Sequence, residues 1–251
     1  LISHYRPDID GLRAVAVLAV ILFHADIALF SGGFVGVDIF FVISGYLITA
    51  ILLREHEAKT FSLIAFYERR VRRIFPALFV VLAATSIAAW LTLLPDDMIA
   101  YAQSLLSTVA FASNVYFSRD IGYFATAAEY KPLLHSWTLA LEEQYYVFFP
   151  LVLMLVWRAK CMQSWLLPLL WLGLIASLII AEWSVSRYPN YSFYLLPSRA
   201  WEFLIGAVLA VYMMRENFSI PLLKYANPLS AMGFIMIVIS IVFYDHATPF
   251  P

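Results

Sequence analysis

Residues 11–53 read GLRAVAVLAVILFHADIALFSGGFVGVDIFFVISGYLITAILL, and this stretch decides the fold of the chain. It contains two apolar segments, residues 12–30 and 34–53, joined by a Ser-Gly-Gly turn. A helix needs roughly 20 apolar residues to cross the hydrocarbon core of a bilayer, so each segment is about long enough to span it. The stretch therefore predicts a membrane hairpin.

The composition extends this prediction to the whole chain. Of its 251 residues 63% are hydrophobic and only 13% are charged, which is far more apolar than a soluble domain. One further segment, residues 98–117, contains several polar side chains and is predicted to be re-entrant or a bent hairpin. We therefore expect an all-α fold, a polytopic transmembrane helical bundle with 7–8 membrane segments in this portion, one of them re-entrant. The other predicted spans are residues 77–94, 137–157, 165–183, 198–214 and 229–243.

Ionisable residues inside the opening hairpin indicate a functional site, because a spanning segment normally excludes them. The eleven-residue step from Arg13 to His24 is close to three helical turns, so both lie on one face, about 17 Å apart. Arg13 could instead be a positive-inside anchor, and His24 a neutral histidine that donates to a helix carbonyl. Asp26 is expected in a turn or at the interface, whereas Asp38 lies within the second apolar segment.

The most basic part of the chain, residues 54–76, is predicted to be a cytoplasmic loop, which places the N-terminus inside. Its arginines are Arg69, Arg70, Arg72 and Arg73. They could serve only as topological anchors that contact anionic lipid. However, Arg69, Arg72 and Arg73 share one helical face, a spacing suited to clamping a phosphate group.

A second group of polar residues lies in residues 132–150, PLLHSWTLALEEQYYVFFP. Glu142 and Glu143 are predicted about two turns deep from the outer side, where each needs a partner, either functional or a structural hydrogen bond to a neighbouring helix. Arg199 and Glu202 are spaced i, i+3, which favours a local ion pair over a substrate contact.

Five motifs together resemble the membrane acyltransferase-3 family, the bacterial O-antigen and peptidoglycan O-acetyltransferases. They occur in the family's order over nearly the whole chain: YRPDIDGLRAVAVLAVILFH, GGFVGVDIFFVISGYLI, FYERRVRRIFPAL, PLLHSWTLALEEQYYVFFP and FYLLPSRAWEFLIGAVLA. The resemblance places the family's Arg-x10-His pair on Arg13 and His24. It places the Arg-x-x-Arg motif on Arg69 with Arg72 or on Arg70 with Arg73, and the glutamate of the third motif on Glu142 or Glu143.

The resemblance implies transfer of an acyl group, usually acetyl from cytoplasmic acetyl-CoA, to a sugar hydroxyl at the outer side of the membrane. Residues 1–251 would form a single transmembrane acyltransferase domain, cut short at its C-terminal end, because family members commonly have more spans and some have a hydrolase-like domain. The arginines would hold the phosphates of the donor while its thioester reaches His24. We predict catalytic roles for His24, Glu142 and Arg13, and acceptor contacts for Asp38, Glu143, Arg199 and Glu202.

In the predicted reaction His24 removes the proton from the sugar hydroxyl or itself carries the acyl group, and Glu142 orients its ring. No metal is expected, since the chain has 5 histidines, a single cysteine and no ligand spacing. The expected partners are membrane lipid and a glycan or lipid-linked sugar, such as lipopolysaccharide O-antigen, together with a fused or separate periplasmic domain; nucleic acid is not expected. The predicted location is the bacterial inner membrane. The alternative function is a proton-coupled transporter or flippase.

Overall fold

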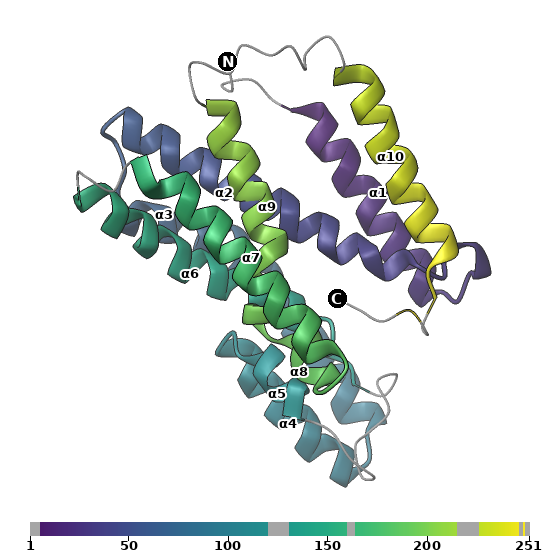
Figure 1. Ribbon diagram of the computed structural model, residues 1–251. Helices are drawn as coiled ribbons and strands as arrows, with labels where there is room; N and C mark the ends of the chain where they lie inside the picture. The colour runs from purple at the N-terminus through teal and green to yellow at the C-terminus, as the bar shows by residue number, and fades with distance from the viewer. Residues whose placement is uncertain (1–5, 120–130, 160–163, 215–225, 246–247, 249–251) are drawn as a thin grey trace. The chain divides into compact units, whose positions relative to one another are not determined.

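The computed structural model describes residues 6–119, 131–159, 164–214, 226–245 and 248. Every regular element in this part of the chain is helical (Figure 1). The elements are α1 Pro7–His24, the 3₁₀ turns η1 Ala28–Phe30 and η2 Gly33–Val35, α2 Gly36–Glu57, α3 Leu63–Thr92, α4 Pro95–Val109, α5 Ser113–Arg119, α6 Ser136–Arg158, α7 Leu166–Val185, α8 Pro189–Tyr194, α9 Leu196–Met214 and α10 Ala226–Phe243.

Five stretches of the described residues are long and apolar enough to cross a membrane, which confirms the prediction of an all-α, multi-pass protein. They are Gly33–Glu57, Leu63–Thr92, Ser136–Arg158, Leu166–Val185 and Pro189–Met214. The apolar helix at Asn227–Phe243 is shorter than these five. The predicted spans 34–53, 137–157 and 198–214 each fall within one of the five, and the predicted spans 77–94 and 165–183 extend one or two residues beyond theirs.

Helix α1 ends earlier than predicted. The sequence predicted a continuous span over residues 12–30, whereas the helix begins at Pro7 and ends at His24. Proline suits the first turn, where its missing N–H costs no hydrogen bond, and the positive φ of 56° at Asp26 takes the chain out of the helix. His24 is therefore the last residue of α1 and does not lie past the middle of a longer span.

Residues 98–117 form two short helices with a sharp bend between them. Phe111 adopts a φ of 51° between α4 and α5, and the side chain of Gln144 donates to its carbonyl at 3.0 Å. Gln144 also donates to Asn114 Oδ1 at 2.8 Å, and Asn114 Nδ2 donates to the carbonyl of Tyr194 at 3.2 Å. The bend that the sequence predicted is therefore present, and the side chain of Gln144 satisfies the Phe111 carbonyl at the bend. The re-entrant placement of this segment in the membrane stays a prediction.

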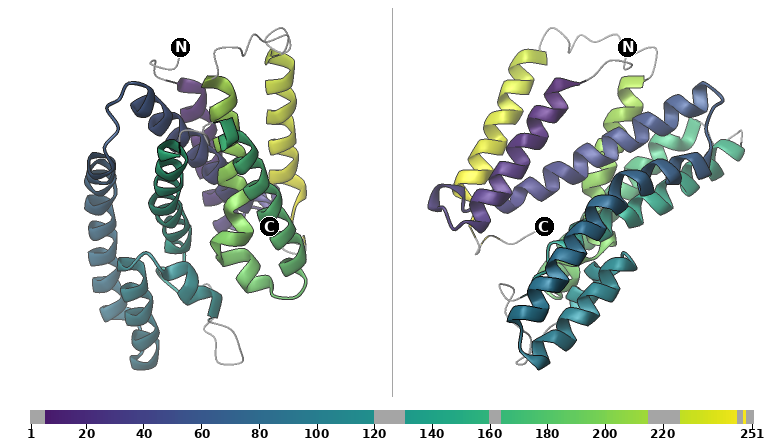
Figure 2. Two further views of the ribbon diagram at one scale, coloured as in Figure 1. Left: turned by 60° about the vertical axis from the view of Figure 1, so that its left-hand side comes forward. Right: turned by 180° about the vertical axis from the view of Figure 1, so that it is seen from behind.

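By their internal contacts the residues fall into two compact units. The first unit consists of Leu1–Ile51, Leu167–Ala176 and Ala200–Phe250, and the second consists largely of Leu52–Leu166 and Ser177–Arg199. In the first unit the turn between α1 and α2 lies against the C-terminal end of α10, where Gly32 N donates to the carbonyl of Ile241 at 2.9 Å (Figure 2). In the second unit a buried cluster joins α3 to α4 and to the turn before α6: Leu82, Ala89, Tyr101 and Leu133.

Candidate active site

The geometry of His24 fixes which ring nitrogen can act as a base. His24 lies exposed at the end of α1, and its Nδ1 lies 2.8 Å from the carbonyl oxygen of Val20. A carbonyl can only accept a hydrogen bond, so Nδ1 must hold the hydrogen, and the lone pair of the neutral ring is on Nε2. The predicted bond from His24 to a helix carbonyl is therefore confirmed. That bond selects the tautomer whose outer nitrogen can take a proton.

Arg13 lies on the same continuous helix, eleven residues before His24. At roughly 1.5 Å per residue the two backbone positions are about 17 Å apart on one face, as predicted. The guanidinium of Arg13 is half-exposed and donates weakly to Asp10, with 3.4 Å between Nη1 and Oδ1. A role for Arg13 in catalysis stays a prediction.

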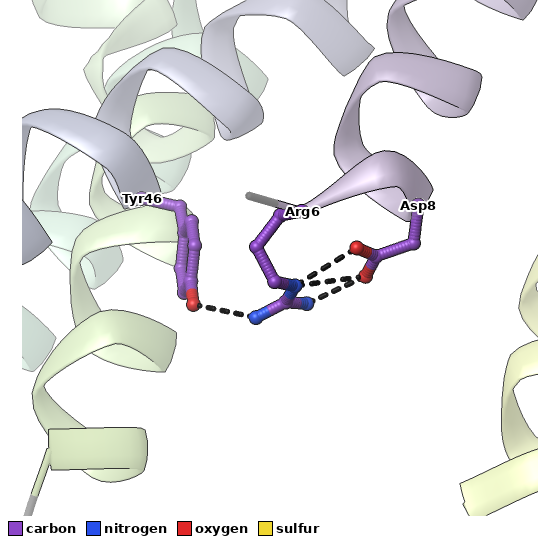
Figure 3. A network of polar contacts seen from close by, with 3 residues as sticks. All are labelled: Arg6, Asp8 and Tyr46. Carbon is purple, nitrogen blue, oxygen red and sulfur yellow. Dashed lines mark hydrogen bonds and ion pairs between the residues drawn. The ribbon is translucent and has the colours of Figure 1, made fainter. Parts of the chain in front are cut away.

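A contact that the sequence analysis missed anchors the start of α1 (Figure 3). Arg6 donates from Nε and Nη2 to the carboxylate of Asp8, at 2.8 and 2.6 Å, and from Nη1 to the hydroxyl of Tyr46 at 3.2 Å. The hydrogen bond from Arg6 lowers the pKa of Asp8 below its usual value. The Arg-Pro-Asp sequence before the first apolar segment could have indicated the local pair, but nothing in the sequence pointed to Tyr46 on α2.

The four arginines lie on a helix and not in a cytoplasmic loop, because α3 begins at Leu63 and the connection from α2 is short. Two of the predicted clamp residues already pair with carboxylates. Arg69 Nη2 lies 2.5 Å from Glu55 Oε1, and Arg72 Nη2 lies 2.6 Å from Glu68 Oε1. Arg73 is exposed on the same helix. Binding of a phosphate by Arg69 or Arg72 stays a prediction and requires exchange of these partners.

Arg70 faces α6 and joins a polar cluster inside the second unit. Its guanidinium lies over the rings of Phe66 and Tyr146, at 5.5 and 5.2 Å from their centroids. Tyr146 donates to Glu142 Oε2 at 3.0 Å, and the charge of Arg70 acts on both Glu142 and Glu143. We call Arg70, Glu142, Glu143 and Tyr146 the α3–α6 cluster. The sequence predicted its charged members separately, but not that they meet.

Glu143 is the least satisfied member of the α3–α6 cluster. Its side chain is half-buried, and Oε1 is shielded from solvent without a hydrogen-bond partner among the described residues. Burying a carboxylate oxygen without a partner is costly, so the position favours a proton or a ligand donor at this oxygen. The contact between Glu143 and a substrate stays a prediction.

The predicted pairing of Glu142 with His24 joins residues of two different units and stays a prediction. The structure does restrict which nitrogen of His24 a carboxylate could bind. Nδ1 of His24, which an orienting carboxylate would normally take, is bonded to Val20. Asp38, one of the predicted acceptor contacts, lies in the first turn of α2, where a carboxylate is favoured by the helix dipole.

Arg199 and Glu202, the remaining predicted contacts, lie on α9 with 0% of either residue exposed. The guanidinium of Arg199 lies over the rings of Trp137 and Phe193, at 5.6 and 5.5 Å from their centroids. Cation–π contacts of a desolvated arginine are worth roughly 2 kcal/mol, so the two rings hold this cation inside the second unit. The predicted ion pair with Glu202, and a substrate contact for either residue, stay predictions.

Comparisons with known proteins match a family model and several bacterial relatives to this chain. A family model described as an acyltransferase domain matches residues 6–250. "Putative O-acetyltransferase SAS0844" of Staphylococcus aureus is 43% identical over 59% of this chain and 25% of its own length. "Putative peptidoglycan O-acetyltransferase YrhL" of Bacillus subtilis is 33% identical over 98% of this chain and 40% of its own length.

An uncharacterized protein of Haemophilus influenzae is 37% identical over 82% of this chain and 86% of its own length. The chain thus spans about a quarter of the length of the staphylococcal relative and about two fifths of the length of the Bacillus one. No solved structure matches the chain.

Proposed function

The chain belongs to the acyltransferase-3 family, and from this premise we propose that it is an O-acyltransferase of a bacterial membrane. The acyl group, acetyl by the family's usual chemistry, moves from a cytoplasmic acyl-CoA to a hydroxyl of a cell-envelope glycan or an exported sugar. The names of the relatives support O-acetyl transfer, and that of the Bacillus protein gives peptidoglycan as its acceptor. An O-antigen acceptor is the other member of the same substrate class.

The observation that carries this proposal is the hydrogen bond between His24 Nδ1 and the carbonyl of Val20. With Nδ1 bonded to Val20, the lone pair of Nε2 accepts the proton of the acceptor hydroxyl as its oxygen attacks the thioester carbonyl carbon. The C–O bond forms, the tetrahedral intermediate collapses, and the C–S bond breaks. The coenzyme A thiolate then takes the proton from the imidazolium, which returns His24 to its starting state.

The second route open to the same nitrogen is covalent. Nε2 would attack the thioester, hold the acyl group as an acyl-imidazole and pass it to the sugar hydroxyl in a second step. The Val20 bond serves both routes equally, since each needs the lone pair on Nε2. Trapping an acylated histidine in protein mixed with acetyl-CoA and no acceptor would separate them.

The donor end of the reaction lies with the arginines of α3. Coenzyme A has phosphates that guanidinium groups bind through paired, charge-assisted hydrogen bonds. To bind these phosphates, Arg69 would have to leave Glu55, and Arg72 would have to leave Glu68. Arg73 is exposed and forms no ion pair among the described residues, so it could bind a phosphate directly. Arg70 already lies over the aromatic rings of Phe66 and Tyr146.

The proposed membrane arrangement follows from the arginines. With these on the cytoplasmic side, the N-terminus is also cytoplasmic, the connections after α1 and α3 lie outside, and α4 with α5 forms a re-entrant segment. Adding α1, α10 and this segment to the five candidate spans gives the proposed 7–8 membrane segments. The proposed partners are membrane lipid, the glycan or lipid-linked acceptor, and a periplasmic domain that handles the acceptor.

The test replaces His24 with two near-isosteres. In His24→Asn the amide nitrogen keeps the bond to Val20 but nothing replaces Nε2, whereas His24→Gln keeps an atom near Nε2 that is not a base. Both variants should lose about 10²-fold or more of acyl transfer while retaining insertion and coenzyme A binding. His135→Ala, at an exposed histidine in the second unit, is the matched control. Transfer at the wild-type rate by the Asn variant would refute the assignment.

A proton-coupled transporter or flippase is the second candidate, favoured by one observation. The half-buried carboxylates of the α3–α6 cluster beside Arg70 are the kind of group that relays protons in transporters. A transporter has no need of a thioester donor. Binding of coenzyme A to the purified chain, weakened by replacing Arg69 and Arg72 with Gln, therefore separates the two functions.

A further inference from the structure

A cavity of about 460 Å³ is formed by α4 and α5. One lining residue comes from α4, and the others lie just before or on α5. Sites for small molecules have volumes of roughly 300–1,000 Å³, so this cavity can hold one or two sugar units. The lining residues, which all belong to the second unit, are Gln103, Ala112, Val115, Tyr116 and Arg119.

The polar groups of this α4–α5 pocket suit a ligand with hydroxyls and a negative charge. Tyr116 donates from its hydroxyl toward the carbonyl of Ala100 at 3.2 Å and toward Gln103 Oε1 at 3.4 Å. With Oε1 turned toward Tyr116, the amide nitrogen of Gln103 has two hydrogens to donate to hydroxyl oxygens. Arg119 adds an exposed guanidinium, whose fork of donors matches a carboxylate or a phosphate.

The wall of the pocket is held in place by the bend between α4 and α5. Ala112 follows Phe111, whose left-handed backbone is fixed by the bond from Gln144 to its carbonyl. The Ala112 amide itself donates to Ser107 at 2.8 Å. The bend is thus tied to α6 by Gln144, and to α8 by the bond from Asn114 to the carbonyl of Tyr194. Such a bend gives a pocket that exists before the ligand arrives, which lowers the entropic cost of binding.

The pocket also lies on the side of the second unit where an acceptor must arrive. Helix α3 has 30 residues, which is about 45 Å, and the arginines occupy its first turns. Helix α4 starts at Pro95, just after α3 ends (Figure 2). Gln103 lies eight residues further along α4, which is about two turns. The pocket is therefore in the half of this unit opposite the arginines, which we assign to the donor.

We propose that the α4–α5 pocket binds an anionic sugar unit of the acceptor glycan. Arg119 pairs with its carboxylate or phosphate, and Gln103 and Tyr116 contact its hydroxyls. The assignment rests on the proposed function for the identity of the ligand as acceptor, but binding itself does not depend on acyl transfer. It narrows the substrate class from any envelope sugar to one with a negative charge.

The test measures binding of three probes to the full chain in detergent: glucuronate, glucose 1-phosphate and glucose. At least one anionic sugar should bind about tenfold or more tightly than glucose, because a charge-assisted contact is worth about 1.5 kcal/mol or more. Arg119→Gln should remove this preference and Arg119→Lys should restore part of it. Gln103→Leu should weaken the binding of all three probes several-fold.

The matched control is Arg187→Gln, which removes one positive charge from the same unit at an arginine that stacks on Trp183 outside the pocket. It should leave the preference intact. Retained coenzyme A binding by Arg119→Gln shows that the variant is folded. Equal affinity of wild type and Arg119→Gln for every probe overturns the proposal. A second result would also overturn the proposal: phosphatidylglycerol micelles displace bound glucuronate, but glucose 1-phosphate does not. The pocket would then be a site for a lipid headgroup.

Failure of this proposal can be told apart from failure of the proposed function. If the chain binds anionic sugars through Arg119 but transfers no acyl group, the pocket is supported and the enzyme assignment is wrong. If acyl transfer occurs and Arg119→Gln accepts anionic and neutral sugars at wild-type rates and affinities, the function stands and the pocket assignment is wrong.

Discussion

The two units of this protein pack their helices by different means. In the first unit backbones approach closely at glycines, because a side chain at Gly33, Gly36, Gly45 or Gly206 would overlap a backbone carbonyl of a facing segment. The described residues of the second unit contain no glycine. Their helices are joined by side-chain hydrogen bonds instead, such as Gln144 to Asn114, Ser86 to Tyr101 and Thr108 to Ser136.

The difference shows how polar groups can be placed inside an apolar bundle. Small residues let membrane helices touch without any polar group, and the contact is then dense and intolerant of change. Side-chain hydrogen bonds hold helices further apart and leave room for other polar groups. The second unit accordingly contains the α3–α6 cluster and the α4–α5 pocket, whereas the first unit presents His24 at the end of a tightly packed helix.

The largest expected effect tests the packing of the first unit. In Gly45→Val the new side chain would overlap the backbone of Phe203, which cannot move aside as a flexible side chain can. We expect destabilisation of about 3 kcal/mol or more, seen as loss of folded protein in detergent thermal unfolding. The control is Gly233→Ala on α10, where nothing lies within 4 Å of the added methyl group and stability should rise by up to about 1 kcal/mol. Equal tolerance of both changes would remove the distinction between the units.

A smaller loss is expected at the bend of the second unit. Gln144→Leu leaves the carbonyl of Phe111 and the amide of Asn114 without this partner, at a cost of about 1–3 kcal/mol. Gln144→Glu keeps an acceptor but cannot donate to Phe111, so it should not restore stability at neutral pH. Thermal unfolding measures the loss, and hydrogen exchange at residues 110–114 should show that it is local. Unchanged exchange there would mean that the amide pair does not hold the bend.

The bond between Ser86 and Tyr101 gives a still smaller effect and can be measured as a pair. The two hydroxyls lie 2.8 Å apart between α3 and α4. Ser86→Ala, Tyr101→Phe and the double variant form a cycle whose coupling energy should be about 0.5–1.5 kcal/mol, as for an ordinary buried hydrogen bond. Additive single effects would show that the second unit does not depend on this bond.

The smallest expected effect on stability comes from the pair of Arg6 and Asp8 in the first unit. The pKa of Asp8 is lowered by the hydrogen bond from Arg6, so the pair adds stability above the unfolded pKa of about 3.9 and loses it as the pH falls through the lower folded value. Because the Asp8 side chain is 57% exposed, the gain should stay below about 1 kcal/mol. The difference in unfolding temperature between wild type and Asp8→Asn should be present at pH 6 and shrink toward pH 3. A constant difference over this range would contradict the linkage.

Sequence reasoning predicted features that depend on neighbours along the chain. The apolar segments, the shared face of Arg13 and His24, and the polar bend in residues 98–117 all follow from helical periodicity and composition. It failed at the end of α1, where a local turn at Asp26 interrupts an apolar run that could have continued to residue 30. It also missed Arg6 and Tyr46, since their contact joins residues forty positions apart.

The membrane class, the family and the position of each chemical group along its helix can all be predicted from the sequence, because hydrophobic length and motif spacing are properties of the chain alone. Which groups meet depends on the tertiary structure. In the folded protein Arg70 lies over the ring of Tyr146, whereas Arg69 pairs with Glu55. Gln103 and Arg119 line one pocket. The physical reason is that a helix's pattern says which residues share a face, but the neighbour that covers that face is chosen by packing between distant segments.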